Sequence, residues 1–165
     1  TASELKAEEP EWWILPDSNL AAVFRDNRHS GALYRSFSTD DGRTWSTPVK
    51  TDFPDATSKV SGQRLLDGRY VLVSNPNPKK RDPLALAISD DGLVFTKMLY
   101  LVGGRHVDYP HVIEHEGRLY VAFSGGKQSV EVLKIRLKDV DAIAMPATPL
   151  LAAPAPNPAP KDNAP

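Results

Sequence analysis

Cysteine is absent from the sequence, and methionine occurs only twice. The lack of cysteine excludes disulfides, thiolate metal sites and cysteine nucleophiles, and it leaves the cellular compartment open. No apolar run reaches about 18 residues, so we expect no membrane-spanning helix. Twenty basic residues are balanced by 21 acidic ones, which gives a formal net charge of −1. Without a basic excess, we expect no nucleic-acid partner.

Proline and glycine are plentiful, at 15 and 10 of 165 residues. This composition favours a loop-rich β protein, and a hydrophobic fraction of 41% is enough for a core in about one domain. The first residues, "TASELKAEEPEWW", lack a basic region followed by an apolar one, so we expect no signal peptide within this chain.

Short alternating stretches recur along the chain and are joined by turn signals, as in "WWILPDSNLAAVFRDN", "RLLDGRYVLVS" and "HVIEHEGRLYVAF". The turns are expected at Pro16–Asn19, Leu66–Arg69 and Glu116–Gly117. Each unit holds about four short strands over about 40 to 50 residues, which is typical of propeller blades. We therefore expect a domain at 1–144 with blades at roughly 9–53, 54–104 and 105–140.

Helix is nearly absent from the pattern. The best candidate is "LKDVDAIAM" at 137–145, as a short helix or a turn. Beyond it, the Pro- and Ala-rich residues 145–165 have no core-forming pattern, and we expect a disordered tail.

The stretch "SFSTDDGRTWS" at 36–46 predicts a tight turn between two strands. Gly42 can adopt the positive φ that such a turn needs. Ser38 and Asp40 can accept hydrogen bonds from nearby backbone N–H groups, so Asp40 is expected to be structural rather than catalytic. The next strand is expected to begin at once, over Thr44–Thr47.

A looser copy of this turn, "ISDDGLVF", occurs at 88–95. We align Ile88 with Ser38, and Phe95 with Trp45, whose ring is expected to pack under the hairpin as an apolar plate. Two similar turns about fifty residues apart indicate a repeat architecture.

Residues 38–45 match S-x-D-x-G-x-T-W, and on this motif the sequence resembles the sialidase superfamily, whose Asp-box (BNR repeat) has that form. The resemblance extends over roughly residues 9–137, through "EPEWWILPDSNLAAVFRD", "DFPDATSKVSGQRLLDGRYVLVSNP", "KKRDPLALAISDDG" and "DYPHVIEHEGRLYVAFSGG". It implies an all-β propeller of the sialidase type, present as about three four-stranded antiparallel blades of a six-bladed fold.

The resemblance also implies an exo-acting glycoside hydrolase that removes a terminal carboxylated sugar from a glycan, with no cofactor and no metal. Tyr109 would be the nucleophile and Glu9 its base. Arg25 and Arg81 would bind the sugar carboxylate, for which the guanidinium fork is suited. A neutral tyrosine avoids the charge repulsion that a carboxylate nucleophile would meet. The family also favours a secreted or periplasmic location.

The sequence departs from the family pattern in three places. The family's first arginine and catalytic aspartate, which lie in its N-terminal half, have no counterpart, so we expect no turnover from this chain alone. Strict spacing places Lys80 where the family has its arginine, and a bulge would be needed to bring Arg81 there. Ser124 replaces the glutamate that follows the tyrosine hairpin.

Other interpretations remain open at this point. Arg25 could pair with Asp26 or Asp41, Glu9 could belong to a solvated acidic end, and Arg64 is a further candidate for lining the site. The chain could be a non-catalytic glycan-binding or assembly propeller. It could also belong to a glycosidase or lyase that acts on another acidic sugar.

Two further patterns need a structural interpretation. Trp12 and Trp13 face opposite sides of a strand, and both are expected in the core rather than stacked on a sugar. "HVIEH" at 111–115 matches an inverted zinc-protease motif, which requires a helix. The preceding proline and the following Glu-Gly turn favour a strand instead, so we expect no zinc.

Overall fold

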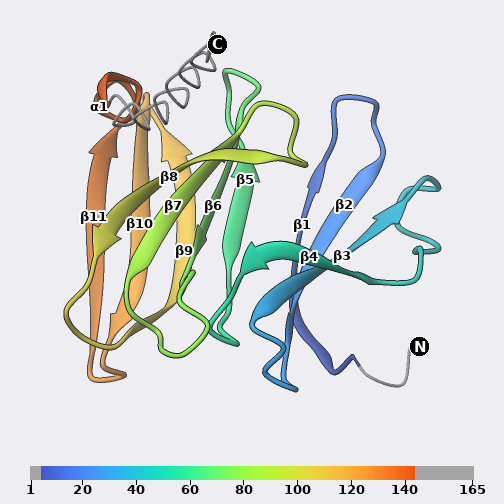
Figure 1. Ribbon diagram of the computed structural model, residues 1–165. Helices are drawn as coiled ribbons and strands as arrows, with labels where there is room; N and C mark the ends of the chain where they lie inside the picture. The colour runs from blue at the N-terminus through green and yellow to red at the C-terminus, as the bar shows by residue number, and fades with distance from the viewer. Residues whose placement is uncertain (1–4, 144–165) are drawn as a thin grey trace, which may run out of the picture.

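The computed structural model describes residues 5–143, and apart from one short helix this part of the chain is all-β. Strands form three antiparallel sheets that follow one another along the chain (Figure 1). The first sheet holds β1 (Ala7–Ile14), β2 (Leu20–Asp26), β3 (Ala32–Ser38) and β4 (Val49–Pro54). The second holds β5 (Ser61–Arg64), β6 (Tyr70–Ser74), β7 (Leu84–Ser89) and β8 (Phe95–Val102). The third holds β9 (Val107–His115), β10 (Arg118–Gly125) and β11 (Ser129–Arg136).

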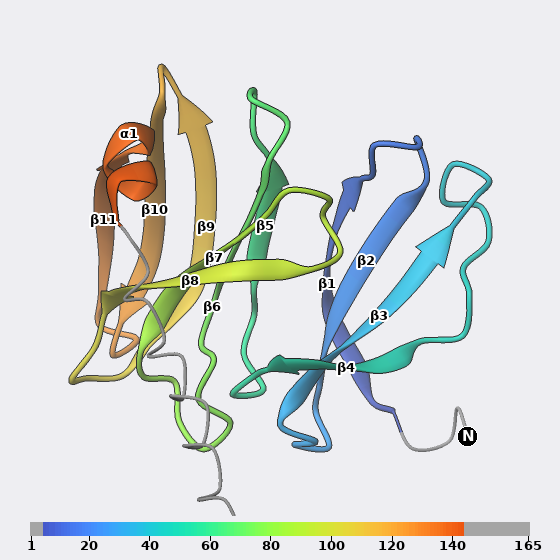
Figure 2. The same cartoon turned by 45° about the horizontal axis from the view of Figure 1, so that its top comes forward.

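Strands β1, β5 and β9 are the inner strands, and they lie side by side while each sheet continues outward from them (Figures 1 and 2). This is the arrangement of consecutive propeller blades, as expected. The three predicted hairpin turns are confirmed, because they join β1 to β2, β5 to β6 and β9 to β10.

The third sheet differs from the expectation of four strands, because the described residues contribute only three. After β11, the chain enters the short helix α1 (Leu137–Ala142), which confirms the helix candidate. The segment "LKDVDA" lacks strand alternation, and its Val140 is buried against the core. The expected tail at 145–165 lies outside the described residues.

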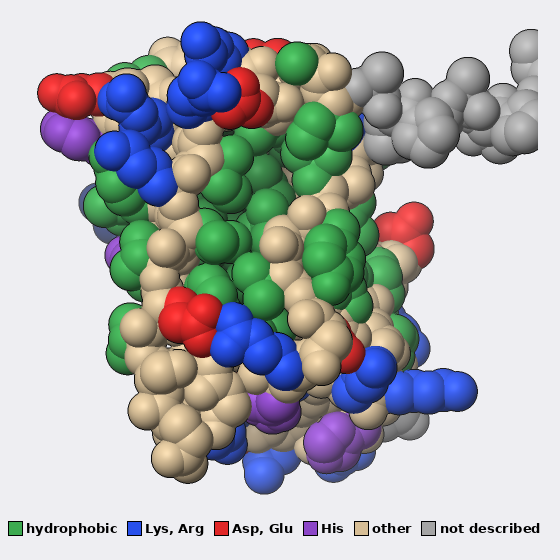
Figure 3. All heavy atoms as spheres, turned by 90° about the vertical axis from the view of Figure 1, so that its left-hand side faces the viewer, with side chains coloured by type: hydrophobic (Ala, Val, Ile, Leu, Met, Phe, Trp, Pro, Cys, Tyr) green, Lys and Arg blue, Asp and Glu red, His purple; other side chains and the backbone are tan. Residues whose placement is uncertain are grey.

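Two apolar clusters fill the spaces between neighbouring sheets. One lies between the first and second sheets, and the other between the second and third. The strands β6 and β7 are buried throughout, because the second sheet is covered on both faces. Figure 3 views the β11 side of the molecule, where hydrophobic side chains gather between charged upper and lower ends. Half-buried residues that pack on the second cluster are Leu99, Leu101, Val102, Leu133, Ile135 and Leu137.

The two neighbouring tryptophans have different surroundings. Trp13 is buried in the first cluster, and its Nε1–H donates a hydrogen bond of 3.0 Å to the carbonyl of Gly92. Trp12 points to the other face of β1 and is 56% exposed. The core expectation is therefore confirmed for Trp13 and wrong for Trp12, because only one face of β1 packs against the second sheet.

The turn at 38–45 has the expected internal hydrogen bonds. The N–H of Gly42, at φ 82°, donates to Ser38 Oγ at 2.9 Å. Both the N–H and the hydroxyl of Thr44 donate to the Asp40 carboxylate, at 2.8 and 2.6 Å. These bonds keep Thr44 in the turn, so the expected strand over Thr44–Thr47 is wrong and β4 begins only at Val49. Trp45 is 41% exposed and donates to the Gly42 carbonyl rather than packing under the hairpin.

The second turn repeats this construction with one residue fewer. Ser89, not Ile88, accepts the hydrogen bond from the glycine N–H, at 2.9 Å from Gly92. Asp91 accepts from the N–H groups of Leu93 and Val94. Ile88 is instead a core residue. The alignment of Ile88 with Ser38 is therefore wrong, because the shorter turn moves the serine by one position.

Candidate functional site

A β-bulge near the start of β1 places Glu9. Glu8 is opposite Arg25 and Glu11 is opposite Val23, so β1 has one residue more than β2 in this interval. Glu9 occupies the bulge with φ 50°, and Pro10 follows it. A bulge redirects a side chain out of the sheet's alternation, and a proline is tolerated there because it has no N–H to lose from the ladder.

A second bulge of the same kind, near the start of β9, places Tyr109. Asp108 is opposite Ser124 and His111 is opposite Ala122, so one residue is again extra. Tyr109 has φ 53°, and Pro110 follows it. Because β1 and β9 are both inner strands that run in the same direction, the two bulges lie at the same end of the molecule, the lower end in Figure 1.

Arg25, on β2, joins the two bulges. Its Nη2 lies 2.9 Å from Glu8 Oε2, and its Nη1 lies 2.7 Å from Glu9 Oε2. Burial lowers the pKa of Arg25, but a hydrogen bond with Glu8, the charge of Glu9 and a hydrogen bond with Tyr109 raise it overall. The guanidinium is therefore charged and in contact with both bulge residues. The alternative pairing with Asp26 or Asp41 is not observed.

Arg81 approaches Tyr109 from the loop before β7. Its Nη1 lies 2.8 Å from Asp108 Oδ2, and its Nη2 donates to the Thr57 carbonyl at 2.8 Å. The guanidinium carbon lies 5.8 Å from the centre of the Tyr109 ring. Lys80 instead binds Asp82 at 2.9 Å, and its side chain is 63% exposed. Of the two residues left open by the spacing, the structure places Arg81 beside Tyr109.

Asp108 is a site residue that the sequence analysis did not identify. Its side chain is fully buried, and its Oδ2 also lies 2.9 Å from Nε2 of His106. Burial raises the pKa of Asp108, but the hydrogen bonds with His106 and Arg81 hold it below its ordinary value. The sequence contained one signal for this role. Asp108 follows Val107 within a strand and stands two residues before Pro110, and an acid inside a strand is expected to need a partner if it is buried.

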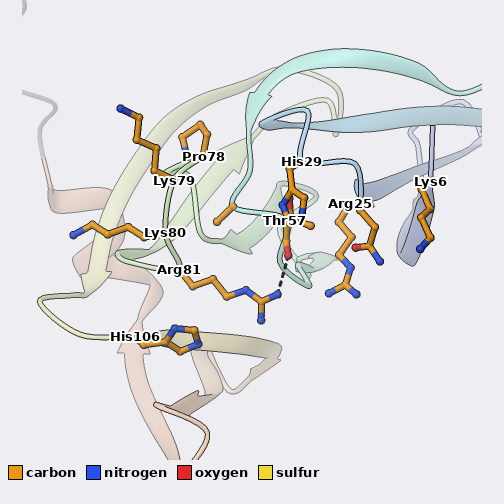
Figure 4. Close-up of a pocket in the computed structure, with 11 residues that line it drawn as sticks. Lys6, Arg25, His29, Thr57, Pro78, Lys79, Lys80, Arg81 and His106 are labelled. Carbon is orange, nitrogen blue, oxygen red and sulfur yellow. Dashed lines mark hydrogen bonds between the residues drawn. The ribbon is translucent and has the colours of Figure 1, made fainter. Parts of the chain in front are cut away.

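Arg25 and Arg81 line a basic pocket of about 630 Å³ (Figure 4). Its lining residues include five lysines or arginines and two histidines, but no aspartate or glutamate: Lys6, Arg25, Asn27, His29, Ala56, Thr57, Pro78, Lys79, Lys80, Arg81 and His106. Glu9 and Tyr109 are not part of this lining, but they contact arginines that are. Figure 4 shows Lys79 and Lys80 extending away from Arg25 and Arg81.

Three buried polar atoms at this site have no hydrogen-bond partner in the described structure. They are Glu9 Oε2, Arg25 Nε and Asp108 Oδ1. Glu9 Oε2 is close to Arg25 but receives no well-aligned hydrogen bond from it. Buried polar groups are almost always paired, so their clustering here indicates a site rather than a structural network.

Arg64 does not belong to this pocket. It lies on β5, with its guanidinium carbon 5.7 Å from the centre of the Tyr70 ring. The "HVIEH" segment lies on β9, so the strand expectation is confirmed. Within residues 5–143, no group of three or more candidate ligands could hold a metal ion. The described helix is too short to cross a membrane.

Solved structures of similar fold include sialidases and an arabinanase. The chain matches the Hadza microbial sialidase Hz136 with a TM-score of 0.68 and 18% identity, over 81% of this chain and 28% of that one. A variant of NanB sialidase from Streptococcus pneumoniae gives 0.69 and 19%, over 82% and 24%. An α-L-arabinanase from Penicillium chrysogenum gives 0.57 and 15%, over 81% and 47%.

At these identities the structures share the fold with this chain, which spans about a quarter of the two sialidase chains. No curated protein matched the sequence. The family described as BNR repeat-like domain matches residues 2–121, most of the chain. The expected resemblance is thus confirmed for the fold and the repeat, and the chain belongs to the BNR repeat-like domain family.

Proposed function

We propose that the chain forms part of a sialidase-type glycosidase that removes a terminal carboxylated sugar, such as sialic acid, from a glycan. One observation carries the proposal. Glu9 and Tyr109, a hundred residues apart, occupy matching bulges and both contact Arg25, while Arg81 lies against the Tyr109 ring. Together they adjoin a pocket whose charged lining residues are all basic.

In this proposal, Arg25 and Arg81 hold the sugar carboxylate. The Tyr109 oxygen attacks the anomeric carbon, its proton passes to Glu9, and the bond to the leaving oxygen breaks, so that this oxygen keeps the electron pair and takes a proton from water. The hydroxide then attacks the anomeric carbon, the bond to Tyr109 breaks, and Glu9 returns the proton to the Tyr109 oxygen. The two guanidiniums favour this step because positive charge near the phenol stabilises the phenolate that develops. The positive φ at Glu9 and Tyr109 costs backbone energy, which is characteristic of residues placed for function.

The first test is binding. N-acetylneuraminic acid and its methyl ester differ only in the carboxylate, so the acid should bind and the ester should bind much more weakly, by NMR titration of the backbone amides. Arg81→Lys keeps the charge but loses the fork, and we expect it to weaken binding of the acid about tenfold. Arg64→Met, which lies outside the pocket, should leave the affinity unchanged.

The second test is covalent. A 3-fluorosialosyl fluoride carries one fluorine at C3 and a second at C2 as the leaving group. Fluoride leaves without protonation by an acid, so Tyr109 and Glu9 suffice to displace it and form a stable adduct. Intact mass should show one added sugar, and peptide mapping should place it on Tyr109. The Tyr109→Phe protein should remain unlabelled. Binding of the acid without any adduct on wild-type Tyr109 would contradict the hydrolase.

A non-catalytic glycan-binding module is the second candidate. One observation favours it. No aspartate or glutamate lines the described pocket, so the lining contains no carboxylic acid that could protonate a leaving group. This module should bind the carboxylated sugar with the same dependence on Arg81. It should give no adduct with the glycosyl fluoride.

A further inference from the structure

His106 and Arg81 are held by the same buried carboxylate oxygen. His106 Nε2 lies 2.9 Å from Asp108 Oδ2, and Arg81 Nη1 lies 2.8 Å from it. Asp108 is fully buried while the His106 side chain is 47% exposed and lines the basic pocket. One ring nitrogen is thus committed to Asp108, which orients the ring, and no group within residues 5–143 is hydrogen-bonded to the other nitrogen, Nδ1.

We propose that His106 is a further ligand-contacting residue, oriented by Asp108, that donates a hydrogen bond from Nδ1 to the carboxylate of an acidic sugar. The proposal rests on the proposed function and adds to it a third basic group beside Arg25 and Arg81. Asp108 acts as the positioning residue, because it fixes both His106 and Arg81.

The hydrogen-bonding geometry gives this contact a pH dependence. If Nε2–H donates to Asp108, Nδ1 carries a proton only in the imidazolium form. The anionic sugar should therefore bind more tightly when His106 is charged. Histidine side chains in general change charge between about pH 5 and 8, so the affinity is compared at these two values.

The other charged groups near His106 are already paired. Arg81 binds Asp108, and Lys80 binds Asp82 in the loop before β7. The β10–β11 hairpin approaches His106 through the Gly126 N–H, which donates to the His106 carbonyl, and its Glu131 is held by Arg105. Among the described residues that line the pocket, His29 and His106 are the two histidines, and His106 is the one held by the carboxylate that also binds Arg81.

The test measures the affinity of N-acetylneuraminic acid at pH 5 and pH 8 for wild type and three variants. Wild type should bind about tenfold more tightly at pH 5, the gain expected for one charge-assisted hydrogen bond. His106→Gln should lose this gain, and His115→Gln, on the exposed far end of β9, should keep it. Asp108→Asn keeps a hydrogen-bond acceptor for His106 but loses the negative charge that favours the imidazolium form. The tighter binding of the acid should therefore appear only at a lower pH.

A measurement on the wild-type protein makes the result independent of variant folding. The ring nitrogen signals of His106 should shift on addition of the acid and not on addition of its methyl ester. If the acid binds with the expected dependence on Arg81 but neither His106 nor its substitution responds, this inference is wrong and the proposed function stands. If the acid does not bind to wild type at any pH, both are wrong.

Discussion

The spaces between the sheets and the lower end of the inner strands are built in opposite ways. Between the sheets, strands such as β5 and β6 pair in regular register, and buried side chains such as Leu86 and Phe123 are apolar. At the lower end, β1 and β9 are bulged, the bulge residues Glu9 and Tyr109 have positive φ, and three buried polar atoms have no partner among the described residues. The difference indicates that regular packing supplies the stability, while irregular backbone positions the candidate site residues.

The largest effect should come from the interior, and β1 provides a matched pair to show it. Trp13→Ala removes a ring that contacts Tyr70 and Phe95 and leaves a cavity, so we expect a loss of about 3–5 kcal/mol in the free energy of unfolding. Trp12→Ala, on the exposed face of the same strand, should cost less than about 1 kcal/mol. Urea denaturation measures the unfolding free energy of both variants. Similar losses for the two would contradict the assignment of one face of β1 to the core and the other to solvent.

Asp55 lies at the boundary between the two regions. Its side chain is almost fully buried, it precedes the pocket residues Ala56 and Thr57, and burial raises its pKa to about 6. Between about pH 4 and 6, the folded state therefore retains a proton that the unfolded chain has lost. The free energy of unfolding should fall as pH rises through this window, by roughly 2–3 kcal/mol.

The Asp55→Asn protein isolates this contribution. It cannot titrate at position 55, so the difference in unfolding free energy between it and wild type should change between pH 4 and pH 7.5 in favour of the variant. Urea denaturation at both pH values gives that difference. A pH-independent difference would mean that Asp55 titrates normally and is not buried as the structure shows.

Substitutions in the two related turns should have the smallest effect of the three. The second turn contacts the core, since Gly92 accepts the Trp13 hydrogen bond, whereas the first projects into solvent. Asp91→Ala should lower the melting temperature by about 3–5 °C and Asp40→Ala by roughly 1–2 °C. Thermal melts followed by circular dichroism measure both, and the reverse order would show that the turns are stabilised locally rather than by the core.

The fold was predictable wherever a local signal was strong. Alternation and turn residues gave three of the hairpins, and the repeat gave the blade-like arrangement. The failures have local causes. Thr44 is retained in its turn by Asp40, the second turn is one residue shorter, and Trp12 lies on a face that nothing in residues 5–143 covers.

The candidate site was predictable only in part. Glu9, Arg25, Arg81 and Tyr109 followed from the resemblance, and their roles remain proposals. Asp108 and His106 were missed because nothing in a linear pattern shows that a buried acid will bind both a histidine two residues before it and an arginine from the loop before β7. The Glu-Pro and Tyr-Pro pairs were visible and could have indicated the bulges.

The sequence by itself determined most of the strands and the three hairpin turns between the first and second strands of each sheet, because period-two alternation and turn chemistry act over a few neighbouring residues. The tertiary structure alone decided which charges meet. Glu9 pairs with Arg25 within the first sheet. Arg81, from the loop before β7 in the second sheet, contacts Asp108 and Tyr109 on β9 in the third. The bulges turn Glu9 and Tyr109 toward a shared end of the inner strands. Such pairings depend on how separate sheets pack, and packing brings together residues that no local pattern connects.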